Sequence, residues 1–469
     1  MFDGGYPFQI YGTLLAEGTE SDSIFFMAHS QTNPGYWHGL RFFDVTSSGG
    51  IMAYCLIQYG RTGVYCSSSS PTFMHCSISN NSGYDGGGVY CCEGSSPTFI
   101  DCTINGNAVD GFDFGVGFGA GVLCWGQNTS PTFTNCSIDA NTAFGPGFLA
   151  CCGGGVSCEM HASPIFTNCT ISYNTAVSQG GGVYCGSYSS PFFTSCIING
   201  NRATDGGDGL GVGGGVCCAD GSSPSFTKCA IIGNFAQEEG DGVYCWLGWF
   251  GDHPPSPIFN STIIAFSEGK GIYFDTIGTE SRIIYCNIFG NSGGPFGGEV
   301  LAGLGELVAT NANGDSCDMY HNIFLNPMFV DTAAGDYHLL AESPCIDAGD
   351  PTLPFDPDNT IADIGAFYYH QLAAEPLVVL LPKAYALHAN WPNPFNSSTM
   401  IRYDVPQAGK VSLTIFNLLG QRVVTLFDGR QLAGTYTIAW DAANLPSGVY
   451  LCRMDAAQFV QTRKLVLVK

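Results

Sequence analysis

Hydrophobic and polar positions alternate in short phrases that recur along most of the chain. In the phrase SPTFTNCSI, Cys136 and Ile138 share one face while Ser137 faces the opposite way. In a second phrase, GVYC at residues 182–185, the tyrosine likewise lies opposite the valine and the cysteine. A period of two is expected of β-strands, and no repeat shows the apolar period of 3.6 that an amphipathic helix needs. The pattern therefore predicts short strands that follow one another without helices.

The first phrase returns at a nearly regular interval, which predicts how the strands are arranged. Its proline is found at Pro71, Pro97, Pro131, Pro164, Pro191, Pro224 and Pro257, and successive prolines are 26 to 34 residues apart. Repeats of this length form solenoids, in which two or three short strands per coil stack on the next coil about 4.8 Å away. We therefore expect a parallel β-helix over residues 1–295, with its clearest repeats at 51–291.

Stacked coils bring equivalent residues above one another, which explains why three positions keep their residue type. One inward position holds Cys55, Cys76, Cys102, Cys136, Cys169, Cys196, Cys229, Thr262 and Cys286. A second inward position holds Cys66, Cys91, Cys124, Cys158, Cys185, Cys218 and Cys245. An asparagine ladder in a tight turn is expected of Asn81, Asn107, Asn141, Asn174, Asn201, Asn234 and Asn291.

The repeat also resembles a known family. FTN at residues 133–135 and at 166–168 resembles the FxxN signature of the polymorphic-outer-membrane-protein type of β-helix, with one residue fewer between phenylalanine and asparagine. GGGV at 180–183 is similar to its second signature, GGA followed by an aliphatic residue, with glycine in place of alanine. The resemblance covers about half the chain and implies a right-handed β-helix in a surface-exposed setting, but no activity.

Residues 296–370 lose the repeat and are expected to close the β-helix by covering its last coil. An acidic group within this segment is a candidate calcium site, since Ca²⁺ prefers oxygen ligands. Its members are Asp347, Asp350, Asp356, Asp358 and Asp363. The alternative is that these residues form turns, which aspartate favours. Residues 371–384 form a linker whose apolar run at 377–382 is too short for a bilayer and is expected to pack between domains.

Residues 385–469 alternate again, with turn residues between the apolar runs, and predict a small antiparallel β-sandwich. NWPNPFN opens this region at 390–396, SGVY lies at 447–450, and KLVLVK closes it. The phrases and their order resemble the type A C-terminal sorting domain of type IX secretion, which is related to immunoglobulin-like tail domains. The residues that carry the resemblance are Pro392, Asn393, Pro394, Phe395, Asn396, Gly448, Tyr450, Lys464 and Lys469.

The sorting-domain resemblance implies export across an outer membrane, contact with the secretion and surface-attachment machinery, and an extracellular or cell-surface location in a bacterium. No secretory signal pattern begins at Met1, and residues 8–26 read as an interior coil of a β-helix. No apolar run reaches the length that a bilayer requires, so no membrane span is expected.

Charge is unevenly divided between the two parts of the chain. The formal charge is −24. Residues 1–383 contain seven basic and 35 acidic side chains, whereas residues 384–469 contain eight basic and four acidic ones. An acidic rod repels nucleic acid and anionic lipid, so a cation, a cationic partner or simple solubility suits it better. Fifteen of the 22 cysteines lie at the two inward positions and are expected to be packed thiols. The better disulfide candidates are Cys92, Cys151, Cys152, Cys217, Cys317, Cys345 and Cys452.

No catalytic set is assembled in the sequence, although two groups of residues are candidates for binding or catalysis. Acidic residues of different coils could meet by stacking, or could serve only solubility or weak Ca²⁺ binding. They are Asp110, Asp113, Asp205, Asp208, Glu238, Glu239 and Asp241. Outward Tyr65, Tyr90, Tyr184 and Tyr244 form a stripe that could bind sugar rings or stack on itself. Arg202 is expected to be a solvated turn residue, and no zinc spacing is present.

The leading hypothesis is a secreted or surface-displayed structural or adhesive protein that is not an enzyme. In one variant, copies assemble head to tail into an extracellular fibre, and a surface glycan is the other candidate partner. The alternative is a carbohydrate-active enzyme, a polysaccharide lyase or glycoside hydrolase of the pectate-lyase-like class. Calcium is the one candidate cofactor.

Overall fold

The chain folds into two compact units, Met1–Gln371 and Leu372–Lys469. The computed structural model describes residues 5–28, 37–43, 50–111, 117–145, 151–207, 210–249, 252–371, 382–457 and 459–468. All regular secondary structure within these ranges is β-strand, and no helix that could cross a membrane is present there. The apolar part of the linker, residues 377–381, lies outside the described residues.

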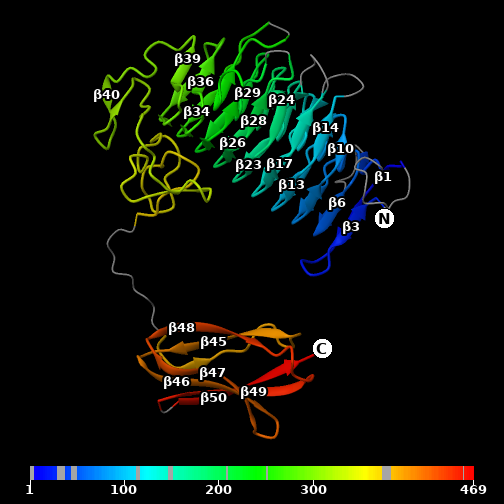
Figure 1. Cartoon of the computed structure of the whole chain (residues 1–469), viewed down its shortest axis with the longest axis vertical. Helices are drawn as coiled ribbons and strands as arrows, with labels where there is room; N and C mark the ends of the chain where they lie inside the picture. The colour runs from blue at the N-terminus through cyan, green and yellow to red at the C-terminus, as the bar shows by residue number, and fades with distance from the viewer. Residues whose placement is uncertain are drawn as a thin grey trace. The chain divides into compact units, whose positions relative to one another are not determined.

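Three long parallel sheets build the first unit, and each coil contributes one short strand to each sheet (Figure 1). The first sheet contains β1 (Phe8–Ile10), β4 (Leu40–Phe43), β7 (Val64–Ser67), β11 (Val89–Cys92), β16 (Val122–Trp125), β21 (Val156–Glu159), β25 (Val183–Cys185), β29 (Val216–Cys218), β33 (Val243–Cys245), β36 (Lys270–Phe274) and β39 (Gly294–Gly298). The second contains β2 (Leu14–Glu17), β5 (Gly50–Ala53), β8 (Thr72–Met74), β12 (Thr98–Ile100), β17 (Thr132–Thr134), β22 (Ile165–Thr167), β26 (Phe192–Thr194), β30 (Ser225–Thr227), β34 (Ile258–Asn260) and β37 (Arg282–Ile284). The third contains β3 (Ile24–Met27), β6 (Cys55–Gln58), β9 (Ser77–Ser79), β13 (Thr103–Asn105), β18 (Ser137–Asp139), β23 (Thr170–Ser172), β27 (Ile197–Asn199), β31 (Ala230–Ile232), β35 (Ile263–Ala265) and β38 (Asn287–Phe289).

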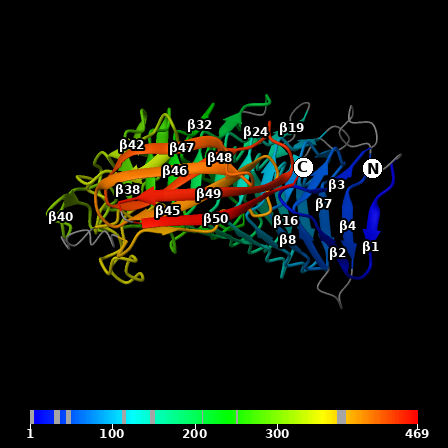
Figure 2. The same ribbon diagram turned by 90° about the horizontal axis from the view of Figure 1, so that it is seen from below.

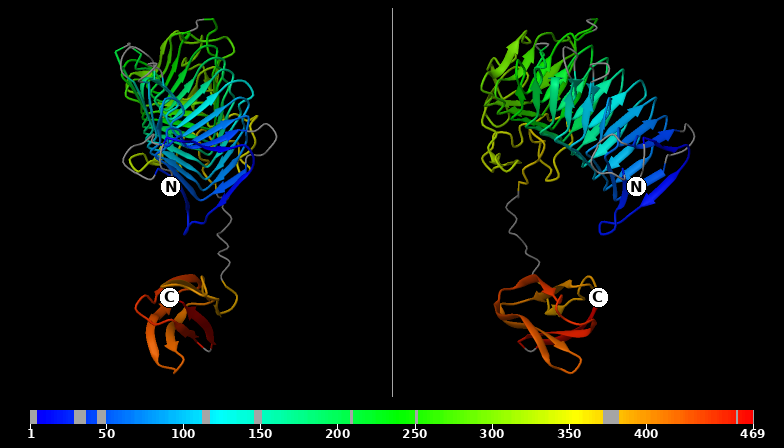
Figure 3. Two further views of the ribbon diagram at one scale, coloured as in Figure 1. Left: turned by 90° about the vertical axis from the view of Figure 1, so that its right-hand side faces the viewer. Right: turned by 45° about the vertical axis from the view of Figure 1, so that its right-hand side comes forward.

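The coils stack in register, so that each phrase of the sequence pairs with the same phrase of the next coil (Figure 3). Thr98, Phe99 and Ile100 pair with residues 132–134, for example, and those residues pair in turn with 165–167. Identical register places like side chains at the 4.8 Å spacing of neighbouring strands. The first unit is therefore a parallel β-helix, as the repeat predicts.

A phenylalanine column, which the sequence analysis did not include, fills the interior beside the cysteines. Its rings are stacked with centroids 4.7 to 5.0 Å apart and planes within 7° of parallel. The column comprises Phe73, Phe99, Phe133, Phe166, Phe193, Phe226 and Phe259, all at most 1% exposed. Offset aromatic pairs of this kind contribute beyond the apolar area that they bury.

The cysteines and asparagines also lie inside and make bonds from coil to coil. Cys102 places Sγ 3.6 Å from the Phe73 carbonyl of the preceding coil. Asn107 donates through Nδ2 to the Ile78 carbonyl at 2.9 Å and to Asn141 Oδ1 at 3.0 Å. Asn107 Oδ1 also accepts from Asn81 Nδ2 at 2.9 Å, so this buried amide is satisfied by both neighbouring coils. All 22 cysteines fall within the described residues, and all are buried and free, including the seven disulfide candidates.

A fourth sheet, the side sheet, lies between the third and the first. It contains β10 (Ser82–Gly83), β14 (Ala108–Asp110), β15 (Gly117–Phe118), β19 (Thr142–Phe144), β20 (Cys151–Cys152), β24 (Thr175–Gln179), β28 (Arg202–Thr204) and β32 (Phe235–Ala236). Cys152 of this sheet, together with Val212, packs against the outward residues Tyr184 and Cys217 of the first sheet.

The side sheet corrects the prediction of a tyrosine stripe. Tyr184 was expected to face solvent but is 2% exposed. The register also places Leu123, Ser157 and Cys217 at the same outward position, so that the tyrosines are not continuous. The side sheet covers the first sheet at these middle coils. The alternation of residues within one strand does not predict such a cover.

Residues 296–371 belong to the same compact unit as the coils and have two roles. Leu304, with the partly buried Phe296 and Phe324, packs against the interior of the last coil. The remainder, with the hairpins β40 (Ala309–Thr310)–β41 (Ser316–Cys317) and β42 (Phe329–Asp331)–β43 (Asp336–Leu339), lies largely on the outer face of the third sheet. The segment thus does more than cover the last coil, which is the role that we expected.

The second unit is a β-sandwich of antiparallel strands. Three strands, β44 (Ala386–Leu387), β45 (Ser398–Val405) and β48 (Gly434–Asp441), form one sheet. The other contains β47 (Arg422–Gln431), β46 (Gly409–Asn417), β49 (Gly448–Ala456) and β50 (Phe459–Leu467), seen side by side in Figure 2. Ile401, Leu413, Trp440 and Cys452 are among the buried residues that fill the space between the sheets.

Candidate functional site

A cleft of about 270 Å³ opens where the side sheet meets the first sheet in the early coils. We call it the aromatic cleft. Its lining comes from β11, β14, β15, β16 and the turn after β10 and comprises Tyr84, Asp85, Tyr90, Asp110, Gly111, Phe118 and Trp125. Concave sites that combine ring faces with a few polar groups are typical of ligand binding.

The strand register explains why these side chains converge. Tyr90 holds an outward position of β11, and Trp125 ends the neighbouring strand β16. Phe118 of β15 lies beside the indole, with ring centroids 6.1 Å apart at an angle of 57°. Its backbone amide donates to Asp85 Oδ1 at 3.2 Å, which holds the carboxylate at the wall of the cleft.

The electrostatics of the aromatic cleft are set by two carboxyl groups. Burial raises the pKa of Asp85, and the hydrogen bond from the Phe118 amide lowers it by a smaller amount. Asp110 is half-buried on β14, and neither Lys nor Arg is part of the lining. Arg61 packs over the ring of Tyr84, with Cζ 3.9 Å from the centroid, at the rim of the site.

Among the described acidic residues considered from the sequence, Asp110 is the one that lines the aromatic cleft. Asp113 and Asp208 lie outside the described residues. Glu238 and Glu239 are exposed, and Asp205 Oδ1 accepts a hydrogen bond from the Gly207 amide at 2.7 Å.

Two further residues have clear structural surroundings. Asp241 is buried, accepts from the Ala236 amide at 3.1 Å and has its pKa raised by that burial. Arg202 is exposed on β28 and lies over the Phe235 ring at 4.1 Å.

Asp85 was missed from the sequence because it follows a tyrosine in a turn that precedes GGGVY and belongs to no column. Its pairing with Asp110 depends on the path of the side sheet, which brings the turn after β10 next to β14 and β15. The one local signal is the aromatic–acidic pair Tyr84–Asp85 itself.

The five aspartates of the calcium prediction bind protein donors. Asp350 Oδ2 accepts from Asn260 Nδ2 at 2.8 Å, and Asp356 forms a buried ion pair with Lys228. Asp358 Oδ1 accepts from Thr360 Oγ1 at 2.8 Å. These contacts tie the segment to the coils and to its own turns.

The other two aspartates of this group are joined by a backbone-to-side-chain hydrogen bond. The Asp347 amide donates to Asp363 Oδ1 at 2.7 Å, and burial raises the pKa of Asp363 to about 6. Across the described residues, no group of three or more His, Cys, Asp or Glu side chains is arranged to hold a metal ion. The geometry favours the turn-forming alternative, and calcium binding stays a prediction.

The sorting motif joins the start of the sandwich to its last strand. Asn393 donates through Nδ2 to the Lys464 carbonyl at 3.1 Å and accepts from the Val466 amide at 2.9 Å. Phe395 is buried against Trp440, with centroids 5.5 Å apart. These contacts make residues 390–396 an integral part of the fold rather than a loose leader.

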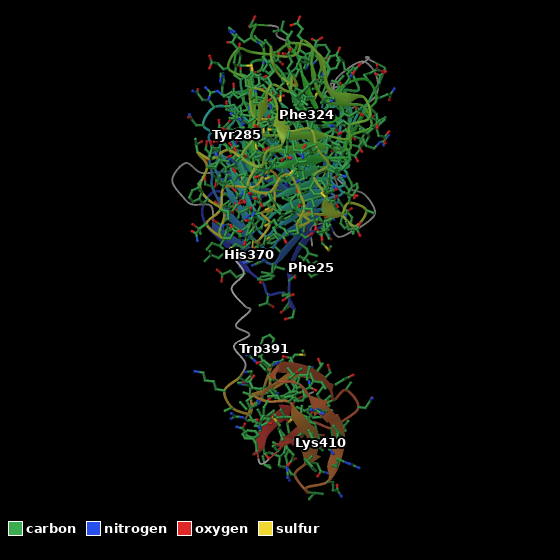
Figure 4. All side chains as sticks on the ribbon, turned by 90° about the vertical axis from the view of Figure 1, so that its left-hand side faces the viewer. Phe25, Tyr285, Phe324, His370, Trp391 and Lys410 are labelled. Atoms are coloured by element: carbon green, nitrogen blue, oxygen red, sulfur yellow. The ribbon has the colours of Figure 1, made fainter. Side chains whose placement is uncertain are left out.

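The remaining motif residues divide between the interior and the surface. Tyr450 is buried and donates through its hydroxyl to the Pro446 carbonyl at 2.8 Å. The exposed members are Pro392, Asn393, Pro394, Asn396, Gly448 and Lys464, and Trp391 beside them is 77% exposed (Figure 4). Lys469 lies outside the described residues.

Comparison with known proteins supports both halves of this description. A solved structure, "Crystal structure of pectate lyase Pel9A", is similar at 13% identity and a TM-score of 0.39 over 78% of this chain and 87% of that chain, which is too weak to indicate an activity. No curated protein matches the chain. The family model "Right handed beta helix region" matches residues 35–148 and 120–313, more than half of the chain, and "Secretion system C-terminal sorting domain" matches residues 389–469. The chain therefore belongs to the right-handed β-helix family and carries a type IX C-terminal sorting domain, which indicates export to the surface or the extracellular space of a bacterium.

Proposed function

We propose that this protein is an adhesive rod, displayed outside the cell, that binds a surface glycan through the aromatic cleft. The observation that carries the proposal is the convergence of four aromatic rings and two carboxyl groups in one concave site. Aromatic faces pack on the apolar face of a sugar ring, while carboxylates accept hydrogen bonds from its hydroxyl groups. The phenylalanine, cysteine and asparagine columns inside the coils support such a site because they hold its strands in place.

The sorting domain supports delivery to the surface through contact with the secretion machinery. A variant of the proposal is that copies join head to tail into an extracellular fibre. The in-register parallel pairing that stacks one coil on the next is the kind of contact that would join two rods, and heterologous contacts that do not close form filaments. Electron micrographs that show only single rods in concentrated protein would exclude the fibre.

A glycan-binding assay tests the proposal. Full-length protein is titrated with neutral and charged oligosaccharides, alongside a Trp125→Ala variant that removes the largest ring of the cleft. We expect binding of at least one oligosaccharide class, weakened about tenfold or more by the substitution. If wild type binds none of them, or if the variant binds equally well, the cleft is not the adhesive site.

A second candidate function is carbohydrate cleavage, which one observation favours. Asp85 and Asp110 line the same cleft, and glycosidases use a pair of carboxyl groups on either side of the scissile bond. Product release from the bound glycan, abolished by Asp110→Asn while binding persists, would make the protein an enzyme. Binding without product release supports the adhesive rod.

A further inference from the structure

The aromatic cleft has a charge that matches one kind of glycan better than others. Its lining supplies the carboxyl groups of Asp85 and Asp110, and the guanidinium of Arg61 is held at the rim against Tyr84. The surrounding rod is also acidic, with seven basic and 35 acidic residues up to position 383. A ligand with negative charges is therefore repelled both by the rod and by the cleft.

The rings of the cleft favour a cation as well. A cation near the face of Trp or Tyr, within about 6 Å of the ring centroid, is attracted by the negative potential of the ring. Arg61 over Tyr84 at 3.9 Å is one such contact at the rim of the site. Tyr90 and Trp125 line the same space and offer this interaction to a ligand.

The cleft contains both parts that an amino sugar needs: rings for the sugar face and carboxylates for a protonated amine. We infer that it binds a glycan whose sugars carry protonated primary amines, of the glucosamine type. This inference rests on the proposed adhesive function and specifies its ligand class. At about 270 Å³ the cleft is near the lower end of ligand-pocket volumes, which suits one sugar unit of the polymer.

The test compares three oligosaccharides of equal length by calorimetry with full-length protein at low salt. They are oligomers of glucosamine, of N-acetylglucosamine and of galacturonic acid, which carry positive charge, no charge and negative charge in turn. We expect the glucosamine oligomer to bind at least about tenfold more tightly than its acetylated form, a difference of about 1.4 kcal/mol. Galacturonate is expected not to bind.

Variants show whether the preference comes from the cleft. Asp85→Asn and Asp110→Asn keep the shape of each side chain and remove its charge, so each should weaken glucosamine binding about tenfold and leave N-acetylglucosamine binding within about threefold. Asp101→Asn is the matched control, because Asp101 is a 38% exposed carboxylate in the turn between the second and third sheets and does not line the cleft. It should leave all three affinities unchanged.

The outcomes separate this inference from the proposed function. Equal affinity for the amine and acetylated oligomers, both weakened by Trp125→Ala, would overturn the amine preference and leave the adhesive cleft in place. Glucosamine binding unaffected by Asp85→Asn and Asp110→Asn would show attraction by the rod as a whole and would also overturn it. If none of the three oligosaccharides binds, both the amine preference and the adhesive cleft are overturned. Trp125→Phe checks that loss of binding in Trp125→Ala does not reflect misfolding.

Discussion

The outer face of the third sheet differs between its two ends, although the strands are the same repeat. In the early coils one outward column holds Ser77, Thr103 and Ser137, which are exposed or half-buried. In the late coils the same column holds Ala230 and Ile263, which are at most 1% exposed because residues 296–371 pack over them. Outward residues of a solenoid strand thus report whether another segment lies above them.

The first sheet repeats this contrast along its own length. Tyr90 lines an open cleft, whereas Tyr184, three coils later at the same register, is covered by Cys152 and Val212. A covered outward position becomes part of a second core, and an open one is free to bind a ligand. The comparison therefore distinguishes residues that should matter for stability from residues that should matter for binding.

The largest effect is expected from a charge placed under the covering segment. Ile263→Asp removes a fully buried side chain and buries an unpaired carboxylate, which should lower the free energy of unfolding by about 4 kcal/mol or more. The matched substitution in the open coils, Ser137→Asp, should change it by less than about 0.5 kcal/mol. Urea denaturation measures both, and equal effects would show that the late coils are not covered.

A smaller decrease in the free energy of unfolding is expected when the ion pair between the covering segment and the coils is broken. Lys228→Ala leaves Asp356, which is 5% exposed, without its cation and should destabilise the first unit by about 3 kcal/mol. Adding Asp356→Asn should recover part of this loss, because the buried charge is then removed. Denaturation midpoints of the single and double variants measure the two stabilities. A double variant that is less stable than Lys228→Ala would contradict the ion-pair role.

The stability of the covered middle coils should depend on pH through Glu159. Glu159 is 4% exposed, and burial raises its pKa to about 8, with the nearby Asp220 adding to the effect. The folded state therefore retains a proton that the unfolded chain, with a pKa near 4.3, has already lost. The associated stability is fully present below about pH 4 and is lost as the pH rises through 8.

Glu159→Gln tests that dependence, since the amide is neutral at every pH. The variant should be more stable than wild type by more than about 1 kcal/mol at pH 9 and should lose the advantage at pH 4. Thermal melts at the two pH values suffice. Parallel stability curves for the two proteins would mean that Glu159 does not titrate in this range.

The smallest effect is expected on the open side sheet. Arg202→Ala removes a guanidinium from the face of Phe235, a contact between exposed or half-buried groups that contributes about 0.5–1 kcal/mol. Arg202→Lys should retain part of it. A loss above about 2 kcal/mol would show that this face is covered in solution, as the late coils of the third sheet are.

The sequence by itself determined the interior of the rod and the identity of its tail. The spacing of the repeated phrases predicted the coils, the recurrence of cysteine predicted two inward positions, and the recurrence of asparagine predicted a ladder. This works because an inward residue contacts its copies in the next coils, as Asn107 contacts Asn141, so that local pattern and tertiary contact coincide. The motif around Phe395 was readable for a similar reason, since it forms a fixed part of the sandwich.

Only the tertiary structure decided what lies on the outside. The burial of Tyr184, the return of residues 309–371 over the third sheet, and the placement of Asp85 and Asp110 in one cleft all depend on segments outside the repeat. The change from serine and threonine to isoleucine and alanine in the outward column of the third sheet was a visible signal of that cover. The period of two predicts which face of a strand a residue occupies. Whether another segment covers that face depends on long-range packing, which the period does not contain.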